Sequence, residues 1–157
     1  MQLVIFLSLD PRYLLEQNAP DIDDYLRLRA DTGLSTKTTE QAKPIFDSSW
    51  LWVRAIEKET GKNVRMGRAV GDSGWCFLIA DIATDPAHQR RGIGRAVLEE
   101  LLSTILLTAP DNPYILVLAD VPGQPLYQSM GFAKTALHSI GMRYATKEVG
   151  SAEKALG

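Results

Sequence analysis

Three arginines surround a short glycine turn at the start of a predicted helix, and this segment has the residue types of an anion site. Arg90 and Arg91 precede Gly92-Ile93-Gly94, and Arg95 follows directly. The helix dipole disfavours each cation by roughly 0.3–1 kcal/mol, and no acidic residue lies between His88 and Arg95. A phosphate bound to the free N–H groups of the first turn would remove this conflict. The pattern predicts a phosphate-binding turn, with a solvated basic turn as the alternative.

The same turn departs from two widespread nucleotide-binding motifs. No Gly-Lys-Ser/Thr follows it, as a Walker loop requires, and the third glycine of the dinucleotide fingerprint is missing. The three arginines suit a ligand that carries several phosphates better than they suit a dinucleotide, whose bridge has two. We therefore expect a phosphorylated ligand that is bound by a different kind of loop.

Strands and helices that can be recognised from their patterns surround the turn. Trp75–Thr84 is a nearly continuous apolar run, typical of a central strand, and apolar residues at i, i+3 and i+4 from Val97 to Leu106 predict an amphipathic helix. Further strands are expected at Leu3–Leu7, Tyr13–Glu16, Trp50–Ile56, Asn63–Val70, Tyr114–Ala119, Phe132–Ala136 and Ile140–Thr146. Further helices are expected from Pro20 to Gly33, from Ser35 or Thr36 through Ala42, and at Leu126–Met130. This order predicts a mixed α+β sheet with helices on both sides.

Length, charge and cysteine content limit the function classes. The 157 residues suit one domain, 1–157, with a loose tail at about 150–157. A formal net charge of −2 gives no global basic field for nucleic acid or an anionic membrane. Cys76 is the only cysteine, so no intrachain disulfide can form and a thiolate zinc site is not expected. Leu3–Leu7 is too short to cross a bilayer and no targeting signal is visible, so we expect a cytoplasmic protein.

Two motifs in this order resemble those of the GNAT superfamily of acyl-CoA-dependent N-acyltransferases. Gln89-Arg90-Arg91-Gly92-Ile93-Gly94 matches its signature, Arg/Gln-x-x-Gly-x-Gly/Ala. Leu126-Tyr127-Gln128-Ser129-Met130-Gly131-Phe132 is similar to its second motif, Leu/Phe-Tyr-x-x-x-Gly-Phe. The resemblance implies a single N-acetyltransferase domain with a mixed, mostly antiparallel sheet of about six to seven strands, flanked by helices on both faces. It also implies a V-shaped split between two parallel strands, here the one ending at Thr84 and the one starting at Tyr114.

The resemblance further implies acetyl-CoA as the cosubstrate, with no metal. The pantetheine arm of acetyl-CoA would lie in the split and pair with the backbone of Ile82, Ala83 and Thr84. Its diphosphate would lie on the amides of the turn, formed by Gln89, Arg90, Arg91, Gly92, Ile93, Gly94 and Arg95. His88 would contact phosphate or solvent.

Catalytic residues follow from the second motif and from the acidic residues near the strand ends. Tyr127 matches the general acid of the family, which would protonate the departing thiolate of coenzyme A. Leu78 and Ala80 occupy positions that often carry the base, and neither can titrate. Asp81 and Asp120 are the candidate bases, and a base acting through ordered water is an equal alternative. The alternative for Asp81, which would point to the opposite face of the strand, is a structural hydrogen-bonding role, and the alternative for Asp120 is to cap a turn.

These assignments predict acetyl transfer from acetyl-CoA to a primary amine of a small molecule, by direct attack in a ternary complex. The amine would enter beside the first two helices, near Tyr25, Arg29 and Trp50. Acetylation of protein lysines or N-termini and a non-catalytic acyl-CoA-binding regulatory module are the alternatives. No nucleic acid or membrane partner is expected, and a homodimer would use a sheet edge or the apolar segment Leu3–Leu7.

Overall fold

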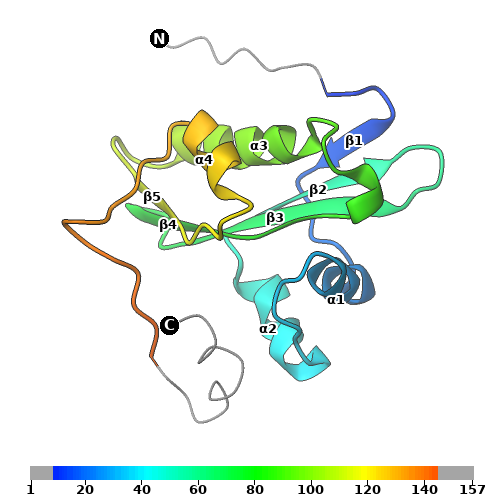
Figure 1. Cartoon of the computed structure of the whole chain (residues 1–157), viewed down its shortest axis with the longest axis horizontal. Coiled ribbons are helices and arrows are strands. Elements are labelled where there is room, and N and C mark those ends of the chain that lie inside the picture. The colour runs from blue at the N-terminus through cyan, green and yellow to red at the C-terminus, as the bar shows by residue number, and fades with distance from the viewer. Residues whose placement is uncertain (1–8, 145–157) are drawn as a thin grey trace.

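A five-stranded sheet runs through the computed structural model, which describes residues 9–144 (Figure 1). The strands follow one another across the sheet in chain order: β1 (Tyr13–Glu16), β2 (Leu51–Glu57), β3 (Asn63–Gly71), β4 (Cys76–Thr84) and β5 (Tyr114–Val117). The first four are antiparallel to their neighbours, and β5 is parallel to β4. This confirms the predicted mixed and mostly antiparallel sheet.

Helices cover both faces of the sheet, as predicted (Figure 1). Helices α1 (Ile22–Asp31) and α2 (Thr39–Ser48) lie on one face, and α3 (Ile93–Thr108) and α4 (Gln124–Ser129) lie on the other. Helix α2 begins later than expected because a capping box between Thr38 and Gln41 defines its start, and the helix continues through Pro44.

Two apolar cores result, one on each side of the sheet. Helix α3 buries the predicted stripe, with Val97, Leu98, Leu101 and Ile105 fully inaccessible to solvent. The other core lies under α1 and α2, where the rings of three aromatic residues meet: Tyr25, Phe46 and Trp52. The cores fix both faces of β3 and β4, from which the site is built.

The two strands predicted near the C-terminus are absent from residues 132–144, so the described sheet has five strands, not six to seven. The N–H of Phe132 donates to the carbonyl of Tyr127 at 3.0 Å and so closes the end of α4, where a strand would have paired with β5. Ile140, Met142 and Tyr144 alternate as a strand would, yet they are largely exposed and pair with no strand. Residues 145 and 146, the segment Leu3–Leu7 and the predicted tail lie outside the described residues.

The predicted split between the parallel strands is present. The ladder between β4 and β5 ends at the pair Ile79 and Val117, whereas β4 continues to Thr84 in pairing with β3 alone. Asp81 lies in this second half with a φ of 53°, at the register shift that falls between Met66 and Arg68 on β3. The last residues of β4 therefore present a free backbone edge toward the split.

Candidate active site

The arginine and glycine turn adopts a conformation that presents backbone N–H groups. Arg90 and Gly92 have φ values of 59° and 76°, so the left-handed conformation occurs twice within three residues. Gly92 is the N-cap of α3, and no side chain caps the helix there. Successive N–H groups in such a turn form a concave anion site at the positive end of the helix. The local geometry thus agrees with the phosphate-binding prediction.

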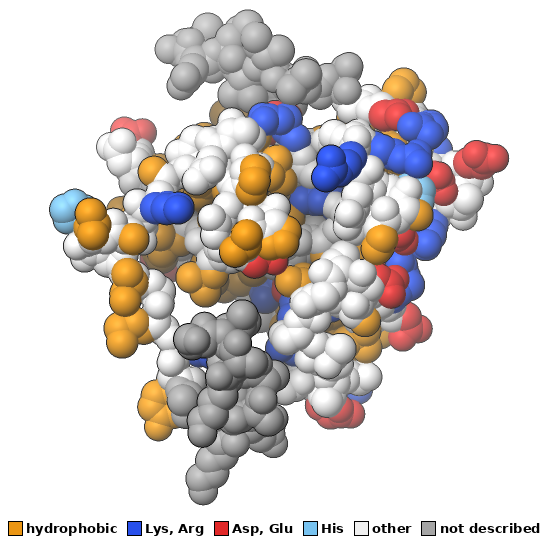
Figure 2. Space-filling view, viewed as in Figure 1, with side chains coloured by type: hydrophobic (Ala, Val, Ile, Leu, Met, Phe, Trp, Pro, Cys, Tyr) orange, Lys and Arg blue, Asp and Glu red, His pale blue; other side chains and the backbone are white. Residues whose placement is uncertain are grey.

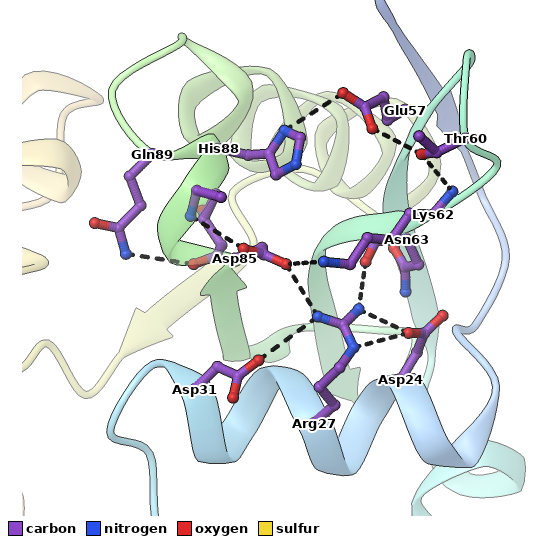
Figure 3. A network of polar contacts seen from close by, with 12 residues as sticks. Asp24, Arg27, Asp31, Glu57, Thr60, Lys62, Asn63, Asp85, His88 and Gln89 are labelled. Atoms are coloured by element: carbon purple, nitrogen blue, oxygen red, sulfur yellow. Dashed lines mark hydrogen bonds and ion pairs between the residues drawn. The ribbon is translucent and has the colours of Figure 1, made fainter.

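Asp85 anchors the start of this turn to two other parts of the fold (Figure 3). Its carboxylate accepts hydrogen bonds from Arg27 of α1 at 3.1 Å, from Lys62 of the β2–β3 hairpin at 2.7 Å, and from the N–H of Ala87 at 3.0 Å. Burial alone would raise the pKa of Asp85, but the bonds from Lys62 and Ala87 and the charge of Arg27 bring it below its ordinary value. Contacts from α1 and from the β2–β3 hairpin therefore hold the start of the turn in place.

His88 and Gln89 also fix the turn. His88 is buried, and its Nδ1 lies 3.0 Å from the hydroxyl of Tyr13 and 4.0 Å from a carboxylate oxygen of Glu57. Gln89 donates from Nε2 to the carbonyl of Thr84 at 3.3 Å. His88 is therefore not a freely exposed side chain, but it also lines the cavity beside the turn, and its contact with phosphate stays a prediction.

A cavity of about 570 Å³ opens at this place, between the free half of β4, the turn and α4. All ten predicted coenzyme-binding residues line it: Ile82, Ala83, Thr84, Gln89, Arg90, Arg91, Gly92, Ile93, Gly94 and Arg95. Figure 2 shows basic and acidic side chains close together on the right of the view, and four of the residues that line the cavity are arginines: Arg65, Arg90, Arg91 and Arg95. The cavity has the charge and the backbone groups that a phosphorylated ligand with a long polar arm would need.

Tyr127 and Asp120 line the same cavity, opposite the turn. Tyr127 is buried, and its ring packs edge-on against Phe132 with centroids 5.8 Å apart. Burial raises the pKa of the Tyr127 phenol, the charge of Arg65 lowers it, and the charge of Asp120 raises it. The phenol is therefore protonated at neutral pH, as a general acid must be.

Gly123 makes the approach of these two side chains possible. The N–H of Gly123 donates to Oδ1 of Asp120 at 3.2 Å. A Cβ added to Gly123 would lie 2.8 Å from that oxygen and 2.9 Å from Cε2 of Tyr127. Any larger residue would push one of the two out of place.

Residues 47–134, more than half of the chain, match the family model of the acetyltransferase (GNAT) domain. The chain belongs to the GNAT acetyltransferase family.

Individual relatives agree with this assignment. Over 145 residues the chain is 26% identical to the probable acetyltransferase TAP2 of Glycine max, which covers 83% of this chain and 58% of that protein. It is 28% identical over 131 residues to the chloroplastic GCN5-related N-acetyltransferase 3 of Arabidopsis thaliana, with coverages of 79% and 54%. The chain thus spans little more than half the length of these relatives.

A crystal structure of a Staphylococcus aureus protein of unknown function, described as a probable acetyltransferase, superposes with a TM-score of 0.80. The two sequences are 29% identical, and the match covers 85% of this chain and 99% of that one. The described fold of this chain is therefore shared with almost the whole of that solved structure.

Asp81, one of the two predicted bases, does not line the cavity of this GNAT protein. It faces α1, where its carboxylate accepts hydrogen bonds from the Tyr25 hydroxyl at 3.1 Å, from Arg68 at 2.6 Å and from Arg29. With both oxygens held by cations, the geometry favours a structural ion pair between β4 and α1. Asp120 is the one carboxylate among the described cavity-lining residues, and it is the better placed candidate.

None of the three residues predicted beside the amine entrance lines the cavity. Tyr25 is fully buried in the core under α1, Arg29 is held by Asp81, and Trp50 packs on Phe77. Thr32 and Leu34, from the loop between α1 and α2, line the cavity on this side. Their position could not be read from sequence, because loop residues carry no periodic pattern.

Arg65 is the cavity residue that the sequence reasoning missed. It lies between Val64 and Met66 on β3, where alternation alone would suggest an outward-facing side chain, but only 5% of its surface is exposed. Arg65 lines the cavity together with the residues of the turn and Tyr127. No local sequence signal marks it, since its burial depends on α3 packing over β3.

A second cavity, of about 690 Å³, lies along the outer edge of β5. Among its described lining residues Lys134 is the one basic side chain, and most of the others are apolar. It therefore lacks the groups that a phosphorylated coenzyme needs.

The described residues 9–144 contain no group of three or more His, Cys, Asp or Glu side chains placed to hold a metal ion. In the same range, no helix is both long and apolar enough to cross a membrane.

Proposed function

We propose that this protein binds acetyl-CoA and transfers the acetyl group to a primary amine of a small molecule, by direct attack in a ternary complex. The observation that carries the proposal is a single cavity with an anion-binding turn at one end and a buried, protonated phenol at the other. Family membership supports acetyl-CoA as the donor.

The shape of the cavity supports this coenzyme. The turn from Gln89 to Arg95 would take the diphosphate on its N–H groups and arginines. The free edge of Ile82, Ala83 and Thr84 would hydrogen-bond the amides of the pantetheine arm, as a strand edge binds an extended peptide. The thioester would then lie near Tyr127.

The residues of the chain suffice for the proton transfers. The neutral amine attacks the thioester carbonyl carbon, and the tetrahedral intermediate collapses as the carbon–sulfur bond breaks. Tyr127 donates its proton to the departing thiolate, and the excess proton of the amine passes to Asp120 or to water and from there returns to the Tyr127 phenolate. The amide and the free thiol of coenzyme A are the products.

The acceptor side supports a small amine over a protein. Thr32 and Leu34 of the α1–α2 loop line the cavity, and they would form a wall beside the entering acceptor. A lysine side chain or a protein N-terminus would need an open groove in its place. Protein acetylation and coenzyme binding without turnover are therefore outcomes that the test must separate.

The test is the release of free thiol from acetyl-CoA with a panel of small primary amines and of lysine-containing and N-terminal peptides. We expect release that depends on a small amine, with an acetylated product of matching mass. Preferred turnover of peptides would contradict the small-molecule acceptor. Coenzyme binding without release for any acceptor would contradict catalysis and leave a regulatory module.

A further inference from the structure

Arg65 is a buried cation without a partner. Its Nε and Nη2 atoms are inaccessible to solvent and make no hydrogen bond with any residue in the described range. Arg68, three residues further along β3, shows the usual arrangement, with its Nε 2.6 Å from the carboxylate of Asp81. Arg65 therefore differs from its neighbour in lacking an acceptor.

The position of Arg65 explains where an acceptor would have to come from. It pairs with Thr84 at the end of β4, and its guanidinium lies directly under the first turn of α3. A Cβ added to Gly94 would lie 3.1–3.3 Å from three atoms of that guanidinium. The glycine at this place thus admits the arginine beneath the helix N-terminus.

Two positive groups face the same space as a result: the N-terminal end of α3 and the guanidinium of Arg65. The nearby carboxylates are engaged elsewhere, since Glu99 lies 3.6 Å from Arg95 and Asp120 binds the N–H of Gly123. Burial lowers the pKa of Arg65 to about 10, which still leaves it charged at neutral pH. A buried charge without an acceptor destabilises a fold, so a bound anion is the partner that this site requires.

We propose that Arg65 is a coenzyme-binding residue, whose guanidinium binds the diphosphate of the acyl-CoA from beneath the first turn of α3. The inference rests on the proposed function and adds one residue to it, a cation on β3 that neither motif contains. Arg65 would act together with the backbone amides through Nη1, the one guanidinium nitrogen that is not among its inaccessible atoms, by a charge-assisted hydrogen bond to a phosphate oxygen.

The proposal has a distinctive consequence for the ligand-free protein. Replacing Arg65 by Met removes an unpaired charge and keeps a long apolar side chain in its place. The Arg65→Met variant should unfold at a higher temperature than the parent, by about 2–8 °C, while it binds coenzyme less well. If Arg65 had a purely structural role, the same substitution would lower the unfolding temperature and leave the affinity for coenzyme unchanged.

Calorimetric titration with coenzyme A tests the proposal in the full chain. We expect the dissociation constant of Arg65→Met to rise by about 10–100-fold, the range for lost hydrogen bonds to a charged group. The matched control is Arg54→Met on the neighbouring strand, where Glu16 already accepts at 2.7 Å. That variant should bind coenzyme A within two-fold of the parent and gain no stability.

Competition with ADP, which carries the diphosphate without the pantetheine arm, identifies the group that is bound. Its inhibition constant should rise in Arg65→Met by the same factor as the dissociation constant of coenzyme A. ADP also lacks the 3′-phosphate of coenzyme A, so an unchanged ADP constant beside weakened coenzyme A binding would place the contact on the arm or on the 3′-phosphate. Either result would overturn the assignment. Coenzyme A binding equal to that of the parent would overturn the role of Arg65 altogether.

Failure of this inference can be told from failure of the proposed function. A parent protein that binds neither coenzyme A nor ADP would overturn both, whereas a parent that binds them equally with Arg65→Met overturns only the inference. If Arg65→Met does not fold, Arg65→Gln, neutral and polar, is titrated in its place. Undiminished affinity in that variant would overturn the inference in the same way.

Discussion

Tyr127→Phe removes the hydroxyl from the proposed acid and keeps the ring. The hydroxyl makes no hydrogen bond with another residue in the described range, and the ring contact with Phe132 does not involve it. The free energy of unfolding should therefore change by less than about 1 kcal/mol. The coenzyme turn is untouched, so coenzyme affinity should also stay within two-fold. A change in the chemical rate can then be assigned to the lost proton.

The expected loss of rate is about 10–10³-fold, equivalent to about 1.4–4 kcal/mol in the barrier. It lies at or below the usual range for a positioned acid, because a thiolate leaves readily and water can protonate it in part. Burial raises the pKa of Tyr127 above 10.0. The phenol is an acid only below its pKa, so the difference between parent and variant should be constant around neutral pH and vanish only at strongly alkaline pH.

Pre-steady-state acetyl transfer at saturating amine measures this step directly. This measurement separates the acid role of the hydroxyl from a role in acceptor binding. If the hydroxyl bound the acceptor, the Michaelis constant of the amine would rise while the rate of acetyl transfer at saturating amine stayed the same. A Tyr127→Phe protein that transfers acetyl as fast as the parent in this measurement would refute the reasoning.

Three further changes test the surroundings of the site. Gly92→Val should weaken coenzyme binding about tenfold or more, because a φ of 76° costs a residue with a Cβ roughly 1–2 kcal/mol; unchanged calorimetric affinity in a folded variant would contradict this. Gly123→Ala should lower the chemical rate, because its Cβ would lie under 3 Å from Asp120 and Tyr127, while coenzyme affinity holds; an unaltered rate would show that their placement is not critical. Asp85→Asn should lower the free energy of unfolding at pH 7 by about 1–3 kcal/mol in denaturant titrations. Folding lowers the pKa of Asp85, so the stability that its carboxylate contributes is present above the pKa of the unfolded state and is lost as the pH falls through the pKa of the folded state. The free energies of unfolding of parent and variant should therefore converge in acid.

Local chemistry explains what could be predicted from the sequence. The turn before α3 was recognisable because Gly92 and the arginines act within a few residues of one another, and the stripe on α3 follows from helical periodicity alone. The positions of β2, β3 and β4 along the chain likewise followed from the residue pattern of each strand. All ten predicted coenzyme-binding residues consequently line one cavity.

Contacts between distant segments explain what could not be predicted. Asp81 looked like a base on its strand, but α1 supplies Arg29, which is 52 residues away in sequence. Arg65 could not be identified because its burial depends on α3. Alternating apolar residues near Ile140 indicated a strand, yet a strand also needs a neighbour with free hydrogen-bonding groups in register.

A titration of the isotope-labelled protein with acetyl-CoA, followed by the NMR signals of its backbone amides, tests the central claim most directly. The account predicts that the largest shifts fall on Ile82–Thr84, on Gln89–Arg95 and on the residues around Tyr127. Signals from the outer edge of β5 should move little. The largest shifts along that edge, or no shifts at saturating acetyl-CoA, would contradict the account.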